Sequence, residues 1–128
     1  MLQSTTSLLG SVLFAASATF VILAGGCTNT RYPDLMRVTA ECDMTIAEQE
    51  RIYTGTGPVA PRTSARDRII NLREKQMIMA QRINVKSMPE VASKAITVAE
   101  GEARKAELVK AATERYNAAL ALPIPVTK

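Results

Sequence analysis

The residue with the clearest chemical meaning in this chain is a cysteine that follows a run of small residues. Cys27 ends the stretch Leu23-Ala24-Gly25-Gly26-Cys27, and residues 8–26 before it carry no charge. Val12 to Ala24 is a suitable apolar core for a secretory signal. Small residues before a cysteine suit a peptidase pocket that excludes bulk, so this stretch has the layout of a secretory signal whose cleavage site ends in a cysteine.

This segment resembles the signal and lipobox of bacterial lipoprotein precursors. In that family the chain is cut directly before the cysteine, and the cysteine then carries lipid such as palmitate. The resemblance covers residues 1–27 and implies lipidation of Cys27 and a place in the bacterial cell envelope. Thr28 lacks the acidic character that the family uses for inner-membrane retention, so the resemblance further implies the outer membrane, facing the periplasm.

Two departures from the family pattern keep an uncleaved inner-membrane anchor as the alternative. Residues 1–30 contain no Lys or Arg, although signals begin with positive charge, and Ala24 stands where the family carries Leu. The apolar run is also about long enough to span a bilayer as a helix. Because Arg31 and Arg37 follow the run, the positive-inside rule would then place the rest of the chain in the cytoplasm.

Residue types that support catalysis or metal binding are scarce. The chain has no histidine, which excludes His-based triads, His metal sites and imidazole proton shuttles. Its two cysteines lie fifteen residues apart and do not match a zinc site. No phosphate-loop lysine follows Gly55 and Gly57. We therefore expect no enzyme activity, metal, cofactor or small-molecule substrate.

The net charge of +4 is concentrated in the middle of the chain, where residues 62–86 hold seven basic and two acidic side chains. Aromatic residues that could stack on bases do not interleave with this charge, so nucleic acid is not an expected partner. A solvated helix face is one interpretation. The other is a surface for anionic lipid headgroups, cell-wall polymer or an acidic partner, formed by Arg66, Arg68, Arg73, Lys75, Arg82 and Lys86.

Helices are the elements expected to position these residues. Beyond the apolar segment the only aromatic residues are three tyrosines, so Ala, Met, Ile, Leu and Val must do the packing. Such a composition favours helix-on-helix packing. We predict an all-α chain: a signal peptide or membrane anchor over residues 1–26, then three helices, the last of them long, rich in alanine, and coiled-coil- or bundle-like.

Residues 27–53 are predicted to form a tether and the first helix. Pro33 suits a first turn, and Asp34 favours the positive end of the helix dipole. An apolar stripe at helical spacing follows, made of Leu35, Val38, Cys42, Ile46, Gln49 and Tyr53. We therefore predict that Cys42 is buried, with an intermolecular disulfide as the alternative. Two glycines and two prolines make residues 54–63 a linker.

Residues 64–122 are predicted to hold the other two helices, as a hairpin or an extended rod. Ser64 with Asp67 resembles a cap that opens the first of them. Gln76 is interpreted as lying at the edge of its apolar stripe, with a polar residue that sets helix register or oligomer state as the alternative. The stripe itself is formed by Ile69, Leu72, Met79 and Ile83.

The last helix is predicted to run without interruption from about Met88 to about Leu122. A capping box at Ser87 and Glu90 opens it, and residues 123–128 form a tail that contains prolines. Two ion pairs are expected along it, Glu90–Lys94 and Glu100–Arg104. Each alanine buries little area, so the seam predicted on this helix must contact another helix along much of its length to be stable. The seam is formed by Ala92, Ile96, Ala99, Ala103, Ala106, Val109, Ala112, Tyr116 and Leu120.

Residues 92–112, with Ala99-Glu100-Gly101-Glu102-Ala103 at their centre, resemble the helical tails of stomatin–prohibitin proteins, which implies a self-associating helix. Together these features predict a lipid-anchored envelope protein with a structural or scaffolding role. It would form a homo-oligomer or hold a helical partner at the membrane surface. The alternative is an uncleaved single-pass protein whose basic helix binds anionic lipid, cell-wall polymer or an acidic partner.

Overall fold

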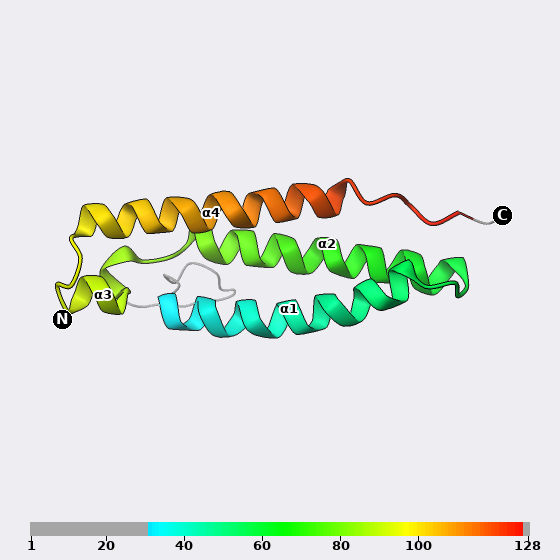
Figure 1. Ribbon diagram of the computed structural model, residues 1–128, viewed down its shortest axis with the longest axis horizontal. Coiled ribbons are helices and arrows are strands. Elements are labelled where there is room, and N and C mark those ends of the chain that lie inside the picture. The colour runs from blue at the N-terminus through cyan, green and yellow to red at the C-terminus, as the bar shows by residue number, and fades with distance from the viewer. Residues whose placement is uncertain (1–30, 127–128) are drawn as a thin grey trace, which may run out of the picture.

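The computed structural model describes residues 31–126, which form a bundle of three long helices (Figure 1). The elements in chain order are α1 (Tyr32–Thr54), α2 (Val59–Gln81), the 3₁₀ helix η1 (Val85–Ser87), α3 (Pro89–Ala92) and α4 (Val98–Leu120). The described residues contain no strand, so the predicted all-α class is confirmed for them. The predicted signal or anchor lies outside the described residues.

Helix α2 is the centre of the bundle. Both α1 and α4 pack along it, and the chain reverses direction between successive long helices (Figure 1). Each long helix has 23 residues and is therefore about 35 Å long. Within residues 31–126, no helix combines the length and hydropathy that a bilayer crossing requires.

The predicted first helix matches α1 closely. Pro33 lies in its first turn, where the missing N–H leaves no hydrogen bond broken. The predicted stripe faces the core: Val38 and Tyr53 are half-buried, and Leu35, Cys42, Ile46 and Gln49 are buried. The apolar residues recur every three or four positions without a break, which is why this helix could be predicted.

The predicted start of the second helix is wrong by about one and a half turns. Helix α2 begins at Val59, so only residues 55–58 connect it to α1, and Ser64 and Asp67 lie inside the helix instead of capping it. The difference arises at Pro61, which the sequence places in the predicted linker of residues 54–63. It is the third residue of α2, and proline is tolerated in a first turn because that N–H has no intrahelical partner.

The predicted single helix from Met88 to Leu122 is also wrong, because the structure breaks it between Ala92 and Val98. Ser87 does not cap α3, whose N-cap is Met88 with no side-chain hydrogen bond. The capping box lies ten residues later. Thr97 Oγ1 accepts a hydrogen bond from Glu100 N (3.1 Å), and Glu100 Oε1 accepts one from Thr97 N (2.8 Å).

The charges near this break are paired differently from the prediction. Glu90 Oε2 accepts a hydrogen bond from Arg104 Nη1 at 2.9 Å, whereas Arg104 was expected to pair with Glu100 and Glu90 with Lys94. Glu100 is used for capping, and the hydrogen bond from the Thr97 backbone lowers the pKa of its carboxyl group. The Arg104–Glu90 ion pair therefore connects α4 to α3 across the break.

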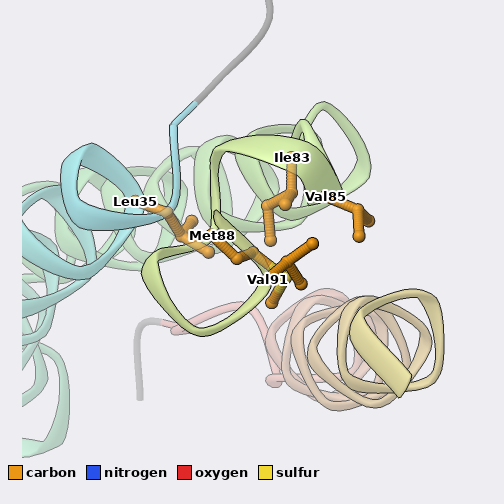
Figure 2. Packing of buried hydrophobic residues seen from close by; sticks show 5 residues of the cluster. All are labelled: Leu35, Ile83, Val85, Met88 and Val91. Carbon is orange, nitrogen blue, oxygen red and sulfur yellow. The ribbon is translucent and has the colours of Figure 1, made fainter. Parts of the chain in front are cut away.

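Two clusters of buried side chains hold the helices together. One lies where α1 begins and contains Leu35, Ile83, Val85, Met88 and Val91 (Figure 2). The other joins α1, α2 and α4 further along and contains Cys42, Ile46, Ile69 and Ala119. Ile46 and Met88 are the largest side chains that are fully buried. Residues from all three long helices therefore contribute to the core.

The alanine seam predicted on the last helix faces away from this core. Ala99, Ala103 and Ala106 are exposed, and α4 instead buries Gly101, Ala112 and Ala119. The predicted seam assumes that residues 93–97 are helical. Because they are not, the predicted positions after the break lie on the wrong face of α4. Of the predicted line, Ala112 alone is buried.

Candidate functional site

The six basic residues predicted as an anionic-surface site do not act as one group. Arg66 is mostly buried, with 15% of its side chain exposed. Its Nε donates a hydrogen bond to the Leu122 carbonyl (2.8 Å), and its Nη2 donates one to the Leu120 carbonyl (3.4 Å). The last carbonyls of a helix have no intrahelical partner, so Arg66 attaches the end of α4 to α2. It is therefore a structural residue.

Arg73 is also held inside the bundle, and 18% of its side chain is exposed. Its Nη1 donates to Asp43 Oδ1 and to Gln76 Oε1, both at 2.9 Å. Gln76 Nε2 donates to the same Asp43 oxygen at 3.0 Å and to the Thr39 carbonyl at 3.3 Å. The prediction that Gln76 lies at the edge of the stripe is wrong. Its side chain is only 3% exposed and lies within the seam between α1 and α2.

The other four predicted residues remain exposed: Arg68, Lys75, Arg82 and Lys86. The first three are seven residues apart, which places them along one line on the outer side of α2, about 21 Å from end to end. A shallow surface depression lies beside this line, with Lys75 and Arg82 at its sides and Ile78 and Met79 among its apolar lining. Lys86 lies beyond the end of α2, in η1.

Cys42 is buried, as predicted, with 5% of its surface exposed and no disulfide partner. It packs with Ile46, Ile69 and Ala119, and burial raises the pKa of its thiol. Reactive cysteines are partly exposed and have a lowered pKa. Cys42 has neither property and acts as a packing residue. Cys27, the predicted lipidation site, lies outside the described residues.

Other concave surfaces of the described residues are open and shallow. One lies beside the α1–α2 connection and is lined by residues 55–59, Arg62 and Val126. The Arg62 guanidinium donates a hydrogen bond to the Tyr53 carbonyl at 3.1 Å, so it secures the end of α1. Within residues 31–126, no three His, Cys, Asp or Glu side chains are grouped so that they could hold a metal ion.

Comparisons of the chain with protein-family models, curated proteins and solved structures found no match. The sequence predicted Lys94 only as an ion-pair partner of Glu90 inside a continuous helix. Lys94, between α3 and α4, has a φ of 65°, which is unusual for a residue other than glycine or asparagine. No local pattern in the sequence indicates that conformation.

Proposed function

We propose that this chain is a membrane-tethered helical module of the bacterial cell envelope, anchored by lipid on Cys27, with a structural or scaffolding role. The observation that carries the proposal is the short distance between the anchor and the fold. Tyr32, the first residue of α1, follows Cys27 by only five residues. Even fully extended, five residues span about 17 Å, so the bundle would be held directly at the membrane surface.

The outer face of α4 supports the second part of the proposal, which is association with another copy or with a helical partner. Ala99, Ala103 and Ala106 lie exposed on this face. Small side chains allow a second helix to approach closely, although each buries little area. We propose that this face contacts a second copy of the chain.

The alternative proposal is an uncleaved single-pass anchor whose basic residues bind an anionic partner. Three residues along the outer side of α2 support it, because Arg68, Lys75 and Arg82 are exposed and aligned. Arg66 and Arg73 no longer contribute to it, since both guanidinium groups are bound within the bundle.

Lipidation is tested by metabolic labelling in bacteria with an alkyne analogue of palmitate. We expect the natural chain to incorporate the label and Cys27→Ser to lose it. Cys42→Ser is the matched control and should be labelled as strongly as the natural chain, because Cys42 is buried. Equal labelling of Cys27→Ser, or none in the natural chain, would contradict the lipid anchor and favour the uncleaved one.

Self-association is tested by Ala103→Glu, which places a charge on the proposed contact face. Because Ala103 is exposed, we expect the stability of the single bundle to change by no more than about 0.5 kcal/mol, while the oligomer dissociates. Sedimentation in detergent and thermal unfolding measure the two effects. Ala47→Glu makes the same change at an exposed alanine of α1 and should leave the oligomer intact. A natural chain that sediments as a monomer would refute self-association through this face.

A further inference from the structure

One end of the bundle gathers the start of α1, the η1–α3 connection and the start of α4 (Figure 1). Leu35 of α1 packs there with Val85, Met88 and Val91, which fixes the connection against the first turn of α1 (Figure 2). Since the proposed tether joins the bundle at Tyr32, it reaches this same end. We call the surface formed by residues 31–35 and 82–98 the tether end.

The exposed charge of the tether end is mainly basic. Arg31, Arg82, Lys86 and Lys94 are all exposed. Of the acidic groups nearby, Glu90 is paired with Arg104 at 2.9 Å, whereas Glu100 accepts a hydrogen bond from the Thr97 backbone in the capping box of α4 and keeps its negative charge. Asp34, in the first turn of α1, and Glu102, the fifth residue of α4, remain as exposed carboxylates. Three of the basic side chains belong to one short segment, residues 82–94.

Lys94 provides an independent observation. It connects α3 to α4 with a φ of 65°, the left-handed conformation in which glycine has no steric penalty and other residues do. The position is exposed, and its neighbours Ala92, Ala95 and Val98 are exposed as well. Glycine would carry no such penalty, whereas Lys94 places an exposed ammonium group at this turn.

We propose that the tether end rests on anionic phospholipid headgroups of the membrane that holds the chain, through Arg82, Lys86 and Lys94. This inference depends on the proposed tether and adds to it the lipid class and the orientation of the bundle. The potential of an anionic surface decays within about 8 Å at physiological ionic strength. A tether of about 17 Å lets the tether end reach that layer or stay outside it, so the basic side chains decide whether contact forms.

The experiment measures lysine acylation in the full chain, reconstituted through its N-terminal anchor into vesicles. One set of vesicles contains phosphatidylcholine alone, and the other contains equal parts of phosphatidylcholine and phosphatidylglycerol. On the anionic vesicles we expect Lys86 and Lys94 to react with a water-soluble acylating reagent about fivefold more slowly than on the neutral ones. The difference should disappear in high salt. Lys110, exposed in the middle of α4, is the internal control and should react equally on both.

Two variants separate the charge of Lys94 from its role in the fold. Lys94→Gly should unfold at the same temperature as the natural chain or a higher one, because glycine relieves the left-handed backbone. On the anionic vesicles its Lys86 should be less protected. Lys94→Arg keeps the charge and should keep the protection. A Lys94→Gly chain in which Lys86 stays fully protected would contradict a role for Lys94 in lipid contact.

The two proposals fail in different ways. If the chain sediments with both kinds of vesicle but Lys86 and Lys94 react equally on both, the headgroup contact is refuted and the tether survives. If the chain sediments with the anionic vesicles only, the tether is refuted, because a lipid or apolar anchor would hold it to neutral vesicles as well.

Discussion

Replacing Gly101 with alanine is expected to destabilise the bundle by about 1–3 kcal/mol, because the added methyl group overpacks the core. A Cβ atom at this position would lie 2.6 Å from Val85 Cγ1 and 2.7 Å from Val91 Cγ2. Both side chains are buried in the cluster around Met88, so neither can move away without disturbing the η1–α3 connection. Urea unfolding followed by circular dichroism measures the effect.

The expected sign makes this prediction informative. In an exposed helix the same change would stabilise by about 1 kcal/mol, since alanine has the higher helix propensity. Gly57→Ala is the matched control, because a Cβ atom there meets nothing within 4 Å and the residue does not have a positive φ. We expect Gly57→Ala to leave stability unchanged or slightly higher. A Gly101→Ala chain as stable as the natural one would contradict the close packing of α4 on η1 and α3.

The second large effect is expected from Asp43→Ala, which should cost about 1–3 kcal/mol. One carboxylate oxygen of Asp43 accepts hydrogen bonds from both Arg73 and Gln76. Removing it leaves a largely buried guanidinium group without its counterion. The Asp43 side chain is about half exposed, so water recovers part of the loss and keeps the effect below that of a fully buried ion pair.

Asp43→Asn is the conservative comparison, because its amide oxygen can still accept a hydrogen bond, and we expect a smaller loss than for alanine. A double-mutant cycle with Arg73→Met isolates the pair from other effects of each change. A coupling energy near zero would show that the network does not hold α1 against α2, and Gln76 would then be a tolerated polar residue in the seam.

Helix α1 could be predicted from the sequence because a single signal determines it. Its apolar residues follow helical spacing without a break, and Pro33 marks its start. The burial of Cys42 followed from its place in that stripe. Local pattern and tertiary packing agree throughout this helix, so pattern alone was sufficient.

The break before α4 could not be predicted in the same way. Residues 93–97 contain no glycine or proline, and the Ser/Thr-x-x-Glu pattern occurs both at Ser87 and at Thr97. Only the second is a capping box in the structure. The face of α4 that packs inward is set by the close approach at Gly101, which depends on contacts with η1 and α3. Helical periodicity carries no information about such contacts.

The basic residues illustrate a further limit of sequence reasoning. Arg66 and Arg68 look equivalent in the sequence, yet one holds the end of α4 and the other is exposed. Arginine side chains are long enough to reach carbonyl groups on a neighbouring helix, so their role depends on which helix lies beside them. The structure therefore leaves four of the six candidate residues exposed, and the proposed headgroup contact adds Lys94, which the sequence analysis considered only as a partner of Glu90.

The lipid on Cys27 that would tether the bundle is tested by the intact mass of the chain purified from bacterial membranes. We expect a mature chain that has lost residues 1–26 and carries acyl groups on an N-terminal Cys27. Although it lacks residues 1–26, this mature chain should be found in the membrane fraction. A mass that retains residues 1–26 with no acyl addition would contradict the claim and leave the uncleaved anchor in its place.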